Sequence, residues 1–179
     1  FVAHGAGYDP RYRAGLDGRL HGVYSDDYIC SEIMTGHPPM VSDPGGWDVL
    51  RKAELFRSVC DMHLGPDRRV ARVDFADGDL RRQHVQWTGA PAYETWINRG
   101  EADWTVTAAG ETHVLPQYGF LALGDGGRGV RAGITRVDGL IVEWSFSDDG
   151  ARAYCNARSP QGERVPFRAL SLSVTPGEG

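Results

Sequence analysis

The stretch VRAGITRVDGLIVEWSF (residues 130–146) decides how the second half of the chain folds. Apolar side chains alternate with polar or small ones on both sides of Asp138-Gly139, a dipeptide typical of tight turns. Alternation with a period of two places successive side chains on opposite faces of a β-strand. The stretch therefore predicts two antiparallel strands joined by a short turn.

The same alternation recurs outward from this hairpin, over residues 66–179. Its apolar members are Val73 and Phe75, Val85 and Trp87, Trp104 and Val106, and Leu170, Leu172 and Val174. Gly-, Asp- and Pro-rich turn signals separate the runs. Eight to ten short antiparallel strands at this spacing are typical of a β-sandwich or jelly-roll domain.

Residues 1–65 have a different pattern. FVAH (1–4) and PPMVS (38–42) are short apolar runs that indicate strands, and SDDYICSEIMTG (25–36) is bounded by helix-capping residues. The helix predicted after Gly46 has an apolar face at Val49, Ala53, Phe56, Cys60 and His63. Strands that alternate with helices indicate parallel βα units, and these units need neighbours that residues 1–65 do not supply. Together with the apolar opening, this predicts a piece of a longer polypeptide.

Composition and motifs exclude several classes of function. A net charge of −5 argues against nucleic-acid binding, and no apolar run is long enough to span a membrane. The three cysteines form no C-x-x-C and the six histidines show no ligand spacing, so we expect no metal site. GDGGRG (124–129) formally fits a dinucleotide fingerprint, but a strand pattern follows it, so we expect a glycine-rich hairpin and no cofactor.

Acidic and aromatic side chains gather at the loops that follow the two predicted strands of residues 1–65. Strand-end loops of parallel sheets lie on one face, and carboxylates beside aromatic rings suit sugars. Ser25 or Asp26 is the expected N-cap of the first helix; we assign the cap to Asp26, and Asp27 then faces the sugar. The candidate substrate-binding residues are His4, Tyr24, Asp26, Asp27, Asp43 and Trp47.

Aromatic residues also flank two later segments, WINRGEADWTV (96–106) and LPQYGFLA (115–122). Two interpretations are open for them. One is a β-domain core around a tight turn, and the other is an exposed aromatic platform for sugars.

Four phrases carry a family resemblance: SDDYICSEIMTGHPPMV (25–41), YETWINRGEADWTV (93–106), LPQYGFLA (115–122) and GLIVEWSFS (139–147). Over about residues 20–147 the chain resembles the C-terminal region of large bacterial (β/α)-barrel glycosidases of the endo-α-N-acetylgalactosaminidase type. The resemblance implies that Phe1–His4 and Pro38–Ser42 are the last two barrel strands. It also implies that residues 1–65 end a (β/α) barrel and that residues 66–179 form an antiparallel β-sandwich packed on it.

The resemblance implies a fragment of a bacterial glycoside hydrolase that contributes part of the sugar-binding rim. Its partners would be a carbohydrate substrate and the rest of the parent polypeptide, and its catalytic carboxylates would lie outside this chain. The resemblance leaves open whether the protein is cytoplasmic or secreted. Two alternatives stand beside it: a non-catalytic carbohydrate-binding or structural β-sandwich module, and a small protein whose helices cover a β-sandwich.

Overall fold

The fold is seen in a computed structural model of the chain, which describes residues 25–39, 47–58, 60, 68–89 and 92–163. Two α-helices precede the strands in the described sequence: α2 (Asp26–Thr35) and α3 (Trp47–Leu55). The strands are β1 (Val70–Phe75), β2 (Arg82–Trp87), β3 (Tyr93–Asn98), β4 (Trp104–Ala108), β5 (Glu111–Leu115), β6 (Gly119–Gly124), β7 (Arg131–Val137), β8 (Leu140–Phe146) and β9 (Ala153–Ala157). Short 3-10 turns, η2 (Ala76–Gly78) and η3 (Asp125–Gly127), follow β1 and β6.

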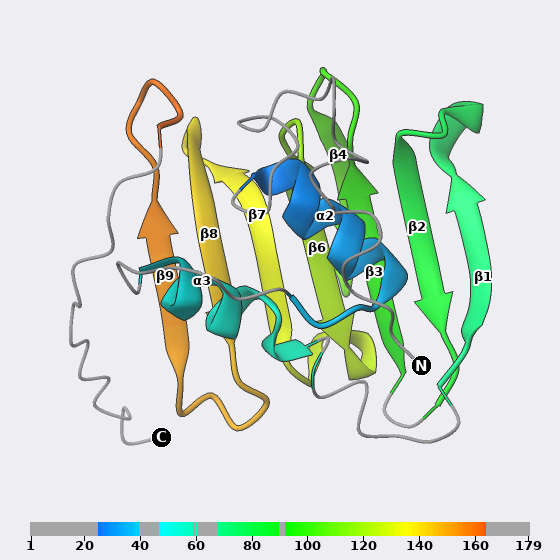
Figure 1. The fold of residues 1–179 in the computed structure, drawn as a ribbon. Coiled ribbons are helices and arrows are strands. Elements are labelled where there is room, and N and C mark those ends of the chain that lie inside the picture. Colours follow the sequence, from blue (N-terminus) through cyan, green and yellow to red (C-terminus); the bar gives the residue numbers. More distant parts are fainter. Residues whose placement is uncertain (1–24, 40–46, 59, 61–67, 90–91, 164–179) are drawn as a thin grey trace, which may run out of the picture.

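The strands form one antiparallel sheet (Figure 1). Its main path runs β1-β2-β3-β6-β7-β8-β9, and every adjacent pair is antiparallel. Strand β7 pairs along its whole length with β8, whereas its other edge is shared by β6 and, at Arg136, by β5. The β4–β5 hairpin therefore leaves the plane of the sheet beside β6.

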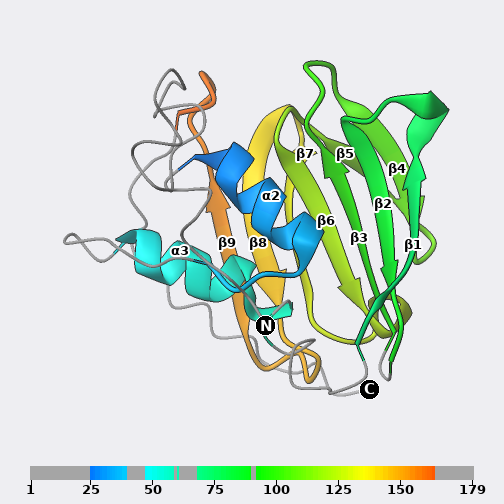
Figure 2. The ribbon, with the colours of Figure 1, turned by 45° about the vertical axis from the view of Figure 1, so that its right-hand side comes forward.

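The two helices cover one face of the sheet, and the β4–β5 hairpin lies against the other (Figure 2). On β6, Phe120 and Ala122 pack with the helices, and Leu121 and Leu123 pack with the hairpin. Because successive strand residues point to opposite faces, one strand feeds both cores. We call these the helix face and the far face.

Helix α2 is capped at both ends and buries an apolar stripe on β3 and β6. The Ser25 hydroxyl accepts a hydrogen bond from the Tyr28 amide at 3.1 Å, and Gly36 ends the helix in a left-handed conformation with φ of 70°. Ile29 and Ile33 are fully buried against the sheet. The helix and its glycine stop were predicted, and both are confirmed.

Helix α3 and the turn after it bury only part of the predicted apolar face. Phe56 is 1% exposed, but Ala53 and Cys60 are exposed, whereas the charged Arg51 and Lys52 are buried. The helix lies beside β7 and β8, so its orientation is set by what β8 presents to it rather than by its own apolar periodicity. In the ranges described, neither helix is long and apolar enough to cross a membrane.

The predicted fold class is wrong. The described residues form a nine-stranded antiparallel sheet with two short helices, which is not the end of a (β/α) barrel, and a single sheet with a folded-over hairpin replaces the two-sheet sandwich. The periodicity of a helix shows that it has an apolar side to bury, but not whether the sheet that covers this side is parallel or antiparallel. Here the antiparallel strands of the later sequence cover it. The predicted strand at residues 1–4 lies outside the described residues, as do residues 40–42 and the expected boundary at 65/66.

Candidate binding site

Charged and polar side chains fill the interface between α3 and strands β8 and β9. On β8, Glu143 and Ser145 point to the helix face and are 1% and 2% exposed. Glu54 of α3 accepts a hydrogen bond from the Ser145 hydroxyl at 3.1 Å and forms an ion pair with Arg152. The helix and the strand therefore meet through matched polar groups.

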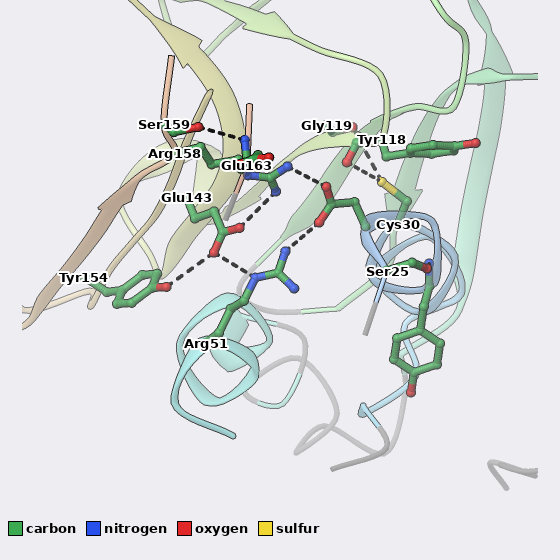
Figure 3. Close-up of polar contacts among 12 residues, drawn as sticks. Ser25, Cys30, Arg51, Tyr118, Gly119, Glu143, Tyr154, Arg158, Ser159 and Glu163 are labelled. Carbon is green, nitrogen blue, oxygen red and sulfur yellow. Dashed lines mark hydrogen bonds and ion pairs between the residues drawn. The ribbon is translucent and has the colours of Figure 1, made fainter. Parts of the chain in front are cut away.

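A ring of alternating charges lies in this interface and consists of Asp26, Arg51, Glu143 and Arg158. Figure 3 labels the last three of them. The two oxygens of Asp26 lie 2.6 Å from Arg51 Nη2 and 2.6 Å from Arg158 Nη1. The two oxygens of Glu143 lie 2.8 Å from Arg51 Nε and 2.9 Å from Arg158 Nη2. Two carboxylates and two guanidiniums balance one another, so the ring can stay charged while it is buried.

The pKa values of Arg51 and of the neighbouring Tyr154 follow from burial and from the charges of the ring. Burial alone would lower the pKa of Arg51, but the charges of Glu143 and Asp26 outweigh it and raise that pKa. Burial and then the charge of Glu143 raise the pKa of the neighbouring Tyr154 hydroxyl, which donates to Glu143 at 3.4 Å. Arg51 therefore stays charged although it is buried, and the paired charges suit a clamp between α2, α3, β8 and the end of β9.

Among the predicted substrate-binding residues, only Asp26 and Asp27 have side chains within the described structure. Asp26 belongs to the ring and is not the N-cap, which is Ser25. Asp27 is 6% exposed, and Arg99 binds its carboxylate at 2.7 and 2.8 Å. Both carboxylates thus already have guanidinium partners inside the molecule. Their role in sugar binding stays a prediction.

The other four predicted residues cannot be placed against a site. His4, Tyr24 and Asp43 lie outside the described residues, and Trp47 begins α3 but its side chain is not described. The structure therefore does not bring the predicted set together.

A pocket of about 590 Å³ opens on the far face, and we call it the far-face pocket. It lies between the β4–β5 hairpin, the η3 loop and strands β7, β8 and β9. It is lined by Ala109, Glu111, His113, Leu123, Gly126, Gly127, Arg128, Arg131, Thr135, Val137, Val142, Trp144, Phe146, Cys155 and Ala157. Its volume is in the range of small-molecule sites.

Aromatic rings form one wall of the far-face pocket. The Trp144 ring centroid lies 5.6 Å from that of Phe146 and 6.3 Å from that of His113. Phe146 is 37% exposed, so its ring is accessible from the solvent. A wall of adjacent rings offers flat apolar area to a ligand whose own faces are apolar.

Trp144 is held in place from two sides. Its indole Nε1 donates a hydrogen bond to Thr135 Oγ1 at 2.9 Å, and its ring lies over Gly133, its cross-strand partner. A Cβ on Gly133 would come within 3.0 Å of the Trp144 ring and 2.9 Å of the Phe120 carbonyl oxygen. Glycine at this position lets the ring lie close to the sheet.

The glycine-rich segment 124–129 closes one end of the pocket. It connects β6 and β7 as a hairpin through η3, so the hairpin prediction is confirmed. Gly127 has φ of 91°, and a Cβ there would come within 2.8 Å of Ala109 Cβ in the β4–β5 turn. The glycine therefore allows two loops to meet at the pocket.

The polar groups of the pocket have different partners. Arg128 is 3.4 Å from Asp125, and Glu111, which is 68% exposed, is 3.9 Å from His113 Nε2. Burial lowers the pKa of His113 and outweighs the charge of Glu111, which raises that pKa. The charge of Arg131 lowers it further, so the imidazole is neutral at pH 7. No group of three or more potential metal ligands occurs within the part of the chain that the structure describes.

Comparisons of the sequence and the structure with family models, curated proteins and solved structures found no match.

Sequence reasoning missed the far-face pocket. The alternation of Val142, Trp144 and Phe146 identified the strand but not the face to which these side chains point. Trp96 and Trp104 are partly buried and pack against the far-face cluster, as Trp144 does, so both interpretations of residues 96–106 stay open. The signal in the sequence was the alternation of Trp144 and Phe146 with the polar Glu143 and Ser145, whose buried partners lie on α3.

Proposed function

We propose that this protein binds a carbohydrate in the far-face pocket, as a non-catalytic binding module. The observation that carries the proposal is the aromatic wall of Trp144, Phe146 and His113 at an open pocket with polar groups on its rim. Sugar rings present C–H faces that stack on aromatic rings, and their hydroxyls need donors and acceptors beside that surface.

One further point supports a sugar over an apolar small ligand. The neutral imidazole of His113 supplies one donor and one acceptor, and the carboxylate of Glu111 supplies two acceptor oxygens, beside the rings. The proposal includes no catalytic step, because binding needs only the wall and rim described.

The test is the affinity of the whole chain for a panel of soluble oligosaccharides, measured by calorimetry, with Phe146→Ala as the variant. Removing this ring removes stacking worth about 0.5–1.5 kcal/mol, so we expect affinity to fall about two- to twelvefold. Phe146 is on the surface, so the fold should persist in the variant.

Phe75→Ala is the matched control, because Phe75 is also a partly exposed phenylalanine, 42% exposed, but stands on the edge strand β1. Its affinity should equal that of the unchanged protein. The proposal is wrong if no saccharide binds, or if the two variants weaken binding equally.

A further inference from the structure

Arg131 differs from the other charged residues of the far-face pocket. It lies on β7 with its guanidinium carbon 5.3 Å from the centre of the Phe146 ring. No carboxylate in the described part of the chain forms an ion pair with it. A guanidinium stacked on a ring keeps its N–H groups free at the edge, where they can donate two parallel hydrogen bonds to a carboxylate.

The charges around Arg131 leave its own charge available. Arg128 is 83% exposed and lies close to Asp125, so that pair is neutral overall. Glu111 stands on the β5 side of the pocket, 68% exposed, where solvent screens it. Within a chain of net charge −5, the guanidinium of Arg131 is therefore a local positive site beside apolar rings.

We infer that the ligand of the far-face pocket is an acidic saccharide, whose uronic-acid carboxylate binds Arg131 while its ring stacks on Trp144 and Phe146. The inference rests on the proposed function and makes it more specific. A carboxylate and a C–H face on one sugar residue match a guanidinium and an aromatic ring that are in contact with each other.

The experiment compares oligogalacturonate, oligoglucuronate and oligomannuronate with their methyl esters, which have the same rings without the charge. We expect at least one acidic oligomer to bind at least about tenfold more tightly than its ester, because charge-assisted bidentate hydrogen bonds are the strong ones. Added salt should reduce this preference. Acetate at the same concentration should not compete, since it has no ring to stack.

Arg131→Gln should remove the preference for the acid over the ester, whereas Arg131→Lys should keep part of it. Arg72→Gln is the matched control, because Arg72 is an arginine on β1 at the far edge of the sheet and its loss changes the net charge equally. Melting curves check that each variant is folded.

The outcomes separate the two proposals. Equal binding of acid and ester, an unchanged preference in Arg131→Gln, or competition by acetate would overturn the acidic-ligand inference and leave sugar binding intact. If no acidic oligomer, no ester and no neutral saccharide binds, both proposals are overturned.

Discussion

Glu143 is a carboxylate in a strand position that would ordinarily hold an apolar side chain. It is 1% exposed, and the two guanidiniums of Arg51 and Arg158 bind its two oxygens. Removing one partner of a buried ion pair leaves the others with uncompensated charge, which costs more than the pair itself contributes. The ring of Asp26, Arg51, Glu143 and Arg158 should therefore be far more sensitive to single changes than any surface pair.

The variant Glu143→Gln keeps the shape of the side chain and removes its charge, so that two buried arginines share the carboxylate of Asp26. We expect the free energy of unfolding to fall by about 3–5 kcal/mol, measured by urea denaturation. Glu101→Gln, at an exposed glutamate, is the control and should change it by less than about 0.5 kcal/mol. A loss below about 1 kcal/mol for Glu143→Gln would show that the ring does not clamp the helices to the sheet.

Strand β8 and helix α3 show where pattern reading succeeds and where it fails. The strand and its Asp138-Gly139 turn were predictable from alternation, and the helix from its periodicity. The face that each element buries was not predictable. The rule that a helix or strand buries its apolar side fails when its polar side chains find buried partners. Glu143 and Arg51 are distant in sequence, and nothing local shows that they meet.

The β7–β8 pair also sets the position of the aromatic wall. Gly133→Ala would place a methyl group 2.9 Å from the Phe120 carbonyl oxygen and 3.0 Å from the Trp144 ring. We expect stability to fall by about 1–3 kcal/mol, as for other overpacked sites, and saccharide affinity to fall with it. Denaturation and calorimetry on one sample measure both.

Gly124→Ala offers the comparison on the adjacent strand β6. Gly124 has φ of −90°, which alanine adopts without strain, and the nearest atom to its Cβ would be 3.3 Å away. This variant should lose less stability and keep its affinity. If Gly133→Ala binds saccharide as well as the unchanged chain, the close approach of Trp144 to the sheet is not needed for the site.

The whole molecule joins the two halves that the sequence pattern separated. Helix α2 and strands β3 and β6 share one buried cluster that includes Ile29, Ile33, Ile97 and Phe120. The helical half was expected to need a parallel sheet from elsewhere, because periodicity does not identify the surface that a helix covers. The candidate site could not be predicted for the same reason, since it depends on which face the helices leave open.

The site predicted from the sequence and the site proposed from the structure lie on opposite faces of the sheet. The residues predicted from sequence, Asp26 and Asp27, lie on the helix face, where arginines hold them. The far-face pocket lies on the other side, around Trp144. A measurement that reports on both faces at once therefore separates the two.

The most direct test is a titration of ¹⁵N-labelled protein with the tightest-binding saccharide of the panel, followed by nuclear magnetic resonance. The indole N–H of Trp144, which donates to Thr135, is the reporter of the pocket, and the amides of Asp26 and Asp27 report on the helix face. We predict saturable shifts at the Trp144 indole and at Arg131, with the two aspartate amides unchanged. Shifts confined to Asp26 and Asp27, or none at Trp144, would contradict a far-face carbohydrate site.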